Sequence, residues 1–356
     1  MPGKIVLDIP PKDDNPRNSE GAFITLKDGT IMFAYSRFRG NHWGDDMDAD
    51  IVALYSYDNG ESFIDERVLF TKEEYDAKNI MSVSFIRLPD GEMAIFHCVR
   101  MGFHDARLIM RKSPDEGKTF GKKINCINYP GYFVVNNDRV RLLSNNRIFI
   151  PAAYHRCIGP DPISWESFNG KGVARFFYSD DNGETFYESP DFGALNVSGG
   201  TCLQEPGIIE LEDGHLYCYS RTDLGCQYTS HSYDYGMTWE PFIPSDFKSP
   251  VSPLSIKQIP NKDVHVAVYN PMPTPENRPK YGWGRTPLVL KTSSDDCKTF
   301  GEPIILENDP ESGYCYTAMH FTKDALLLAY CAGGHEDSGC LNRLRIRKIP
   351  LAQICP

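Results

Sequence analysis

Several features are scarce in this sequence, and long apolar runs are the first of them. No stretch is apolar for long enough to span a bilayer, and residues 1–8 lack the apolar run of a signal peptide. No basic block offsets the formal net charge of -11, which argues against nucleic acid or an anionic membrane as a partner. We therefore expect a cytoplasmic protein, or a secreted one if its signal has been removed, that binds neither nucleic acid nor membrane. Such a protein can still bind an anion where arginines converge.

Paired cysteines and metal-ligand spacings are also missing. The chain has 11 cysteines from Cys98 to Cys355, an odd number without a Cys-x-x-Cys motif. This favours free thiols in a reducing compartment. His42 and His155 have no partners at metal-binding spacing, so we interpret them as structural histidines and expect no metal and no cofactor.

Helical periodicity is almost absent as well. Only residues 73–78 show a pattern that suits a single helical turn. The composition still supplies a core, because 41% of the residues are hydrophobic and 12% are aromatic. The sequence therefore predicts an all-β protein.

What the sequence does contain is a repeated eight-residue box, first seen as Ser-Tyr-Asp-Asn-Gly-Glu-Ser-Phe at 56–63. In its pattern, Ser-x-Asp-x-Gly-x-Ser/Thr-aromatic, the Asp can bond the backbone ahead of it and the Gly tolerates the positive φ of a tight turn. Copies follow about 53 to 66 residues apart, the period of a unit of several strands. They lie at 113–120, 179–186, 232–239 and 293–300, where Cys297 replaces the glycine.

A hairpin pattern, in which two apolar strands flank a short polar turn, precedes each box and occurs once more after the last box. Each hairpin followed by a third strand, which carries the box into a fourth, predicts a blade of four antiparallel strands. Residues 344–351 and 4–9 are expected to complete the final blade side by side. Because the repeat fills most of the chain, we expect a single domain, residues 1–356. The hairpins lie at 23–33, 84–96, 140–150, 207–217, 255–266 and 319–329.

The boxes resemble the Asp-box, or BNR, repeats of the sialidase (neuraminidase) superfamily, and the resemblance covers nearly the whole chain. It implies a six-bladed β-propeller of four-stranded antiparallel blades. In that family the boxes are turns at the outer rim of the blades, so they predict the fold and not the chemistry. The resemblance implies an active site with an arginine cluster that binds a substrate carboxylate, an Asp acid/base and a Tyr nucleophile activated by a Glu.

Four arginines match the family's clamp by their place between the boxes. Arg17 stands at the start of the first hairpin and Arg37 follows that hairpin, with surface positions as the alternative for both. Arg221 closes the return strand of the fourth hairpin, although the family's arginine can lie nearer to the position of Gln227. Arg285, in Gly-Arg-Thr-Pro-Leu, resembles the family's final Arg-x-x-Leu strand. The resemblance implies that these arginines hold the carboxylate.

Three residues match the family's catalytic positions. Loop 39–50 corresponds to the mobile loop that supplies the acid/base, and of its four aspartates we choose Asp45 for its spacing and its position after a glycine. A solvated acidic loop or a calcium site is the alternative interpretation. Glu205, in Gln-Glu-Pro-Gly, corresponds to the base that assists the tyrosine. In the first strand of the last hairpin, the distance to the turn favours Tyr316 over Tyr314 as the nucleophile.

At some positions this chain has charged residues that depart from the pattern of the sialidase superfamily. Glu20, close after Arg17, is expected either to neutralise that arginine or to act as a catalytic carboxylate itself. Asp138 and Arg139 fall where sialidases usually have a small glycine-containing segment, so this pair is expected to alter the pocket. We expect at least one of Arg107 and Arg139 to line it.

The sequence thus predicts an exo-acting, retaining glycoside hydrolase that removes a terminal acidic sugar, sialic acid or a related one, from glycoconjugates. In this hypothesis Asp45 protonates the leaving oxygen while Tyr316, polarised by Glu205, attacks the anomeric carbon. One alternative is a glycosidase or lyase of the same fold that acts on a uronide or rhamnoside through Glu20, Asp138 or Glu205. Another is a carbohydrate-binding propeller without catalytic activity. The sequence leaves the oligomeric state open.

Overall fold

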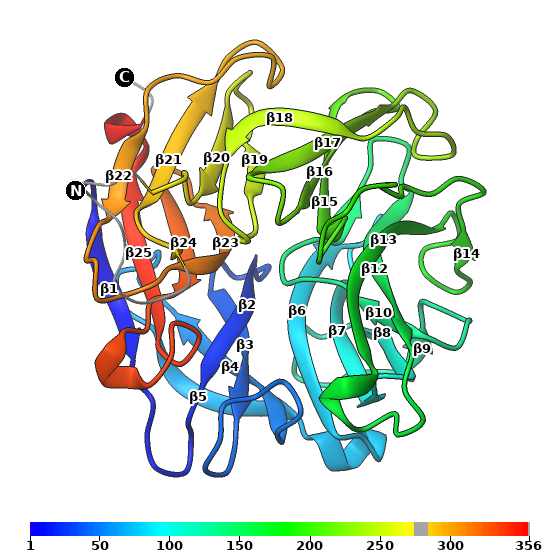
Figure 1. Ribbon diagram of the computed structural model, residues 1–356. Helices are drawn as coiled ribbons and strands as arrows, with labels where there is room; N and C mark the ends of the chain where they lie inside the picture. Colours follow the sequence, from blue (N-terminus) through cyan, green and yellow to red (C-terminus); the bar gives the residue numbers. More distant parts are fainter. Residues whose placement is uncertain (274–283, 355–356) are drawn as a thin grey trace. The chain divides into compact units, whose positions relative to one another are not determined.

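The computed structural model describes residues 1–273 and 284–354 of the chain. These residues form β-strands and four short 3₁₀ turns, with no α-helix among them (Figure 1). The first turn, η1, confirms the single turn predicted close to it, and no helix in the described part is long and apolar enough to cross a membrane. The turns are η1 (Lys72–Tyr75), η2 (Trp165–Ser167), η5 (His335–Asp337) and η6 (Leu351–Gln353).

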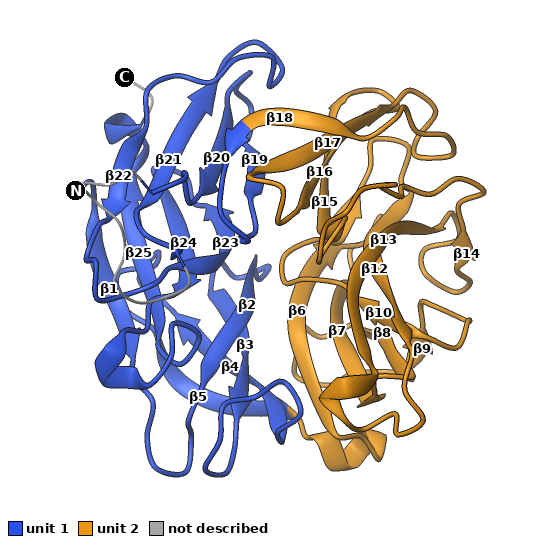
Figure 2. Cartoon of the chain, in the orientation of Figure 1, with its two compact units in different colours: residues 1–69, 247–356 blue, residues 70–246 orange. Residues whose placement is uncertain are grey.

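The chain divides into two compact units, residues 1–69 with 247–356 and residues 70–246, drawn in blue and orange in Figure 2. Three four-stranded sheets lie mainly in the first unit. The first sheet has the order β2 (Asn18–Thr25), β3 (Ile31–Phe38), β4 (Ala49–Ser56) and β5 (Ile64–Phe70). The second has the order β19 (Ser255–Gln258), β20 (His265–Tyr269), β21 (Leu288–Ser293) and β22 (Ile304–Glu307). The third has the order β1 (Lys4–Ile9), β25 (Leu344–Pro350), β24 (Ala325–Cys331) and β23 (Cys315–Phe321).

Two further sheets lie mainly in the second unit. One has the order β15 (Gln204–Glu212), β16 (His215–Arg221), β17 (Cys226–Ser232) and β18 (Ile243–Lys248). The other has nine strands, ordered β14-β13-β12-β10-β8-β7-β6, with β9 added on β8 and β11 on β12. Its strands are β6 (Asn79–Arg87), β7 (Met93–Gly102), β8 (Asp105–Ser113), β9 (Ile124–Asn125), β10 (Tyr132–Val134), β11 (Arg141–Leu142), β12 (Ile148–Cys157), β13 (Phe168–Ser179) and β14 (Tyr187–Glu188).

The nine-stranded sheet contains two antiparallel meanders, β6 to β9 and β11 to β14, joined through β10. Tyr132 of β10 pairs in parallel with Ala106 of β8 and antiparallel with His155 of β12. The described strands therefore form six meanders in five sheets. The all-β class and the six hairpins are confirmed. The six-bladed arrangement and the single domain stay predictions.

The two ends of the chain meet in one sheet. Strand β1 pairs antiparallel with β25, from Lys4 opposite Lys348 to Ile9 opposite Leu344. This confirms the pairing predicted for residues 4–9 and 344–351, and it covers the edge of β25 that β24 leaves open.

Buried second strands supply most of the core. In each hairpin the return strand is a nearly continuous apolar run, as in β24, where every residue is buried. Such runs suit a strand covered on both faces. In the second unit, for example, Phe149 of β12 and Phe176 of β13 pack in one cluster with Leu216 and Cys218 of β16.

Each box forms the turn between the third and fourth strand of its meander. In the third copy, the Asp181 carboxylate accepts from the Ser179 hydroxyl at 2.7 Å and the Thr185 amide at 2.9 Å. The Ser179 hydroxyl oxygen accepts from the Gly183 amide at 2.9 Å. Gly183 has a φ of +82°, and a Cβ there would lie 2.4 Å from the Met110 methyl carbon, so glycine fits this copy of the box best.

The fifth box shows that the turn survives without glycine. Cys297 has a φ of +62°, and its amide still donates to the Ser293 hydroxyl at 3.1 Å. The Thr299 hydroxyl and amide, together with the Ser293 hydroxyl, lower the pKa of Asp295 to about 2. The carboxylate is therefore the constant centre of the box, because it collects several donors in every copy.

We expect Asp181→Ala to lower the free energy of unfolding by about 1–3 kcal/mol, because the amide and hydroxyls of one box lose their common acceptor. Urea denaturation of the variant and the wild type measures the loss. Glu302→Ala, at an exposed position, serves as the control and should change stability by less than about 0.5 kcal/mol. Equal effects of the two substitutions would show that the box carboxylate does not stabilise the fold.

Candidate active site

Arg17 binds two carboxylates just before strand β2. Its side chain is only 1% exposed, yet Nη1 lies 2.6 Å from Asp45 Oδ1 and Nη2 lies 3.1 Å from Glu20 Oε1. Burial alone would lower the pKa of Arg17, but the charges of Asp45 and Glu20 raise it above its ordinary value. The structure therefore brings three of the residues chosen from the sequence into one ionic cluster.

Other groups fix the orientation of the Arg17 guanidinium. Nε donates to the Ser19 hydroxyl at 2.9 Å and Nη1 donates to the Trp43 carbonyl at 3.3 Å. The Phe38 ring lies 4.3 Å from its central carbon. Arg17 can thus hold Asp45, at the half-exposed loop, and Glu20, in the interior, at fixed positions.

Arg285 and Tyr316 form a second cluster in the same unit. The Arg285 central carbon lies 5.5 Å from the centre of the Tyr316 ring. Its Nε and Nη2 donate to the Val251 carbonyl at 3.3 and 3.2 Å, and Nη1 donates to Cys315 Sγ at 3.1 Å. Arg285 is buried and Tyr316 half-buried. A cation thus lies close to the phenol that the sequence selects as nucleophile.

Three buried cysteines lie beside this cluster. Cys315 of β23 stands opposite Cys331 of β24, and Cys340 packs against both. Hydrogen bonding to Cys315 and burial raise the pKa of Cys340, while the charges of Arg285 and Arg17 oppose that rise. The charges of Arg17 and Arg285 therefore both reach these thiols.

Four first strands share a bulge that carries candidate residues. In β2, β6, β15 and β23, two residues of the strand stand opposite one residue of the next strand. The first residue of each bulge is left-handed: Glu20 (φ +57°), Ser82 (+63°), Glu205 (+47°) and Tyr316 (+56°). Left-handed backbone costs a residue other than glycine about 1–3 kcal/mol and is concentrated at functional sites.

Glu205 in the second unit is paired with Arg221. Arg221 Nη1 lies 3.0 Å from Glu205 Oε2; the Glu205 side chain is buried and that of Arg221 is mostly buried. Nε of Arg221 donates to Gln204 Oε1 at 3.2 Å, and Nη2 donates to the same oxygen. Gln204 and Arg221 are partners in the β15–β16 register. The structure brings the predicted base and the predicted clamp arginine together.

Asp138 and Arg139 bond to strands β6 and β16 of this unit. The Asp138 amide donates to the Val83 carbonyl at 2.8 Å, next to the Ser82 bulge. The Arg139 guanidinium donates to the Tyr219 hydroxyl at 3.2 Å. Asp138 is itself left-handed, with a φ of +57°. Both side chains are buried.

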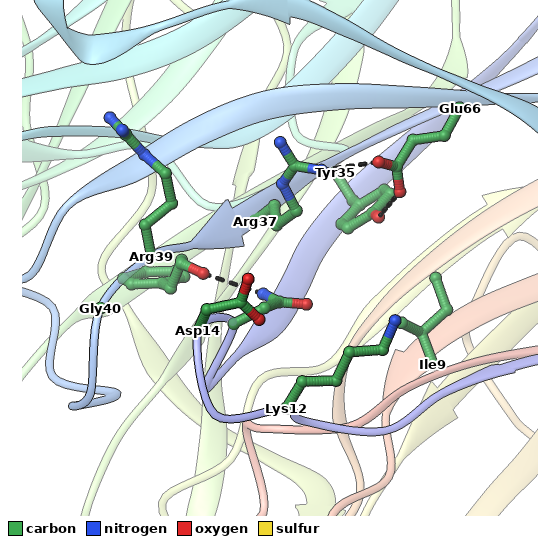
Figure 3. A pocket seen from close by; sticks show the side chains of 10 residues that line it. Ile9, Lys12, Asp14, Tyr35, Arg37, Arg39, Gly40 and Glu66 are labelled. Atoms are coloured by element: carbon green, nitrogen blue, oxygen red, sulfur yellow. Dashed lines mark hydrogen bonds and ion pairs between the residues drawn. The ribbon is translucent and has the colours of Figure 1, made fainter.

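Arg107 and Arg37 each pair with an acidic residue that belongs to none of these clusters. Arg107 forms a two-pronged ion pair with Asp105 at 2.5 and 2.6 Å. Arg37 pairs with Glu66 at 2.6 Å in a separate cavity of about 490 Å³, where Figure 3 shows Tyr35 directed at the same carboxylate. The structure does not bring Arg37 to Arg17. Neighbouring residues of a strand face opposite sides, so the Phe38 ring faces Arg17 and the Arg37 side chain does not.

A protein-family model matches most of the sequence of this chain. The model, described as a BNR repeat-like domain, matches residues 44–328. The chain belongs to the BNR repeat-like domain family. No curated protein gave a significant match to the sequence.

Solved structures similar to this BNR repeat-like chain have the sialidase fold. A Hadza microbial sialidase, Hz136, has a TM-score of 0.73 at 16% identity, covering 96% of this chain and 67% of its own. The leech intramolecular trans-sialidase, solved with 2,7-anhydro-Neu5Ac, has a TM-score of 0.72 at 13% identity, covering 99% and 71%. A Dyadobacter fermentans protein of unknown function has a TM-score of 0.72 at 16% identity, covering 98% and 100%. At these identities the similarity shows the fold alone.

Two parts of the candidate site were not predicted from the sequence. The cysteines were interpreted as scattered thiols, although Cys315 and Cys331 are cross-strand partners. Ser82, which occupies the same bulge position as Glu20, Glu205 and Tyr316, was also passed over. Aligning the first strands of the six hairpins on their turns would have found Ser82. Among the described residues, no group of three or more His, Cys, Asp or Glu side chains is arranged to hold a metal ion.

We expect Arg17→Met to lower the free energy of unfolding by about 3–5 kcal/mol, because it leaves Glu20 buried without its cation. The double variant Arg17→Met/Glu20→Gln should lose less than the single variant, since it removes the charge as well. Urea denaturation measures both.

Arg37→Met is the matched control for this experiment. It breaks an ion pair whose Glu66 side chain is 48% exposed, so we expect a loss of about 0–1 kcal/mol. A similar loss for Arg17→Met and Arg37→Met would contradict the buried ionic cluster.

Proposed function

We propose that this protein is an exo-acting, retaining glycoside hydrolase of sialidase-like fold that removes a terminal acidic sugar. The main support is Tyr316, a half-buried phenol on a left-handed bulge with the Arg285 guanidinium 5.5 Å from its ring. A nearby positive charge stabilises the phenolate that forms as the nucleophile loses its proton. We further propose that the six meanders are the blades of one propeller domain, residues 1–356.

The proposal gives the catalytic steps to three residues. Tyr316 attacks the anomeric carbon and forms a covalent glycosyl intermediate. Glu205 takes up the phenol proton, as the resemblance to sialidases implies. Asp45 protonates the leaving oxygen and then activates the water that releases the sugar. Its half-exposed loop position supports this role, because the carboxyl is accessible.

The acidic sugar is proposed from the arginines and from the similar structures. Arg17, Arg221 and Arg285 are assigned to the carboxylate, whereas Arg37, which pairs with Glu66 in a separate cavity, is no longer assigned to it. Arg139 and Glu20 are assigned to substrate binding as well. The leech trans-sialidase was solved with a sialic acid derivative, and a Trypanosoma rangeli sialidase with 2,3-difluorosialic acid as a covalent intermediate. These complexes support an acidic sugar as the first substrate to test.

We expect Tyr316→Phe and Asp45→Ala each to lower kcat at least about 10²-fold, because one removes the nucleophile and the other the proton donor. Turnover of an aryl sialoside measures this effect. Tyr187→Phe, at an exposed tyrosine, is the control and should keep wild-type kcat. Near-normal turnover in both site variants would remove the assignment.

The hydrogen bonds that Arg17 and Arg221 already make within the chain favour a second candidate function. Four of the five N–H groups of Arg17 already donate to groups of this chain, namely Ser19, Trp43, Asp45 and Glu20. Arg221 is similarly engaged by Gln204 and Glu205. A substrate carboxylate would have to displace these acceptors. The same fold would then act on a different sugar, as a glycosidase or lyase that uses Glu20, Asp138 or Glu205.

We expect a substrate panel to separate the two candidates. Aryl sialosides, uronides and rhamnosides are compared by kcat/KM with the wild type and with Glu20→Gln. Preference for the sialoside supports the first candidate. Turnover of the uncharged rhamnoside alone, lost in Glu20→Gln, supports the second most strongly, because a uronide still carries a carboxylate. Saturable binding of a sugar without turnover of any substrate would instead favour a carbohydrate-binding protein.

A further inference from the structure

Two histidine rings meet on the sheet of strands β15 to β18 in the second unit. His215 begins β16, and His231 lies in β17, the neighbouring strand (Figure 1). The Nε2 atom of His215 lies 2.9 Å from the Nδ1 atom of His231. In the strand register His231 stands opposite Tyr217, so His215 is its diagonal neighbour on the same face. The pairing of the two strands therefore brings two imidazole nitrogens to one place on the sheet.

Tyrosine rings pack against both imidazoles. The Tyr233 ring is stacked on the His215 ring, with 4.5 Å between their centroids, and the Tyr217 ring lies 5.2 Å from the His231 ring. Both histidines are half-buried, so solvent reaches them. Packed rings on paired strands lose little further freedom when they bind a ligand. The two nitrogens are thus accessible and already held together.

The distance between the nitrogens matches two ligands at right angles on one metal ion. Nitrogens that each lie about 2.0–2.1 Å from an ion, at about 90° to one another, are about 2.8–3.0 Å apart. A tetrahedral ion with bonds of the same length needs a separation of about 3.3–3.4 Å. The observed 2.9 Å agrees with the right-angled arrangement. That arrangement is typical of Cu(II) and Ni(II), and of these two ions Cu(II) binds nitrogen ligands more tightly.

The same distance fits a hydrogen bond in which one ring donates a proton to the other. A metal ion needs the lone pairs of both nitrogens, so it replaces the shared proton, which passes to solvent. The pair supplies two ligands, and among the described residues no third His, Cys, Asp or Glu side chain completes a larger group. Water therefore fills the remaining positions around an ion bound there.

We propose that His215 and His231 form a binding site for one Cu(II) ion, with Nε2 of His215 and Nδ1 of His231 as adjacent ligands. The ion has no part in the proposed sugar chemistry. Strand β16 runs from His215 to Arg221, which separates the site from the candidate clamp arginine by about 20 Å. The ion bridges β16 and β17, and so it stabilises the folded chain, in which these strands are paired.

The test is a calorimetric titration of the full chain, without a histidine tag, with Cu(II) in glycine buffer. Glycine binds copper weakly, so low-affinity surface sites stay empty. We expect about one Cu(II) ion per chain in the wild type. Affinity should fall at least about 10²-fold in His215→Gln and in His231→Gln, because a single imidazole lacks the second ligand in the same molecule. His104→Gln, at an exposed histidine outside the pair, is the matched control and should bind as the wild type does.

Two results of this titration would overturn the proposal. Equal affinity in the wild type and in both pair variants would show that copper binds elsewhere, for example to the thiols that every variant keeps. Absence of saturable binding to the folded wild type would leave the histidines with a hydrogen bond only. Circular dichroism checks the fold of each variant, and His215→Ala takes the place of a glutamine variant that does not fold.

Thermal unfolding measures the bridge between the strands directly. The two nitrogens come together only when β16 and β17 are paired, so the folded chain binds the ion more tightly than the unfolded chain. Free Cu(II) at about 100 times the dissociation constant should raise the Tm of the wild type by about 3–5 °C. The Tm of His231→Gln should rise by less than about 1 °C under the same conditions. Equal shifts in the two proteins, or no shift in the wild type, would refute a copper ion that bridges the strands.

Discussion

The bulge at the start of the first strands is the constraint on which the candidate site depends. It inserts one residue into a strand, gives that residue a left-handed backbone, and frees a carbonyl from the ladder. Neighbouring strands use the freed carbonyls: Val83 accepts from the Asp138 amide and Thr317 accepts from the Ser255 hydroxyl. The same distortion therefore ties one meander to the next and gives Glu205 and Tyr316 directions that a regular strand would not.

The chain repeats two different structural devices. The boxes collect donors on one carboxylate at the turn between the third and fourth strands, where the flanking residues are exposed. The bulges lie in first strands, where the buried Glu20 and Glu205 are each paired with an arginine. The sequence of the box varies little from copy to copy because the side chains of the box make the hydrogen bonds that form the turn. The bulge carries Glu, Ser, Glu and Tyr because only its backbone has to be repeated.

The same distinction decides what could be predicted from the sequence. The hairpins, the boxes and the pairing of the chain ends follow from short-range patterns, so their prediction succeeded. Arg37 was grouped with Arg17 by spacing alone, whereas strand alternation sends its side chain to Glu66. The thiol cluster depends on contacts between Cys315, Cys331 and Cys340, which a single sequence does not reveal. The spacing of residues in the sequence reveals repeated backbone structure. It does not reveal side chains that come into contact only in the folded protein.

The arginines show why recognition of the family does not settle the substrate. A carboxylate clamp needs guanidinium N–H groups that face the ligand. Those of Arg17 and Arg221 already donate to acidic and amide groups of the chain. Binding an anionic sugar there requires the buried Glu20 or Glu205 to be displaced or protonated, and either change opposes binding by leaving a buried group without its partner. An uncharged sugar meets no such cost, because its hydroxyls donate to the carboxylates while the arginines keep their bonds. Under the proposed function, the balance between these two situations, and not the number of arginines, would determine which sugar binds.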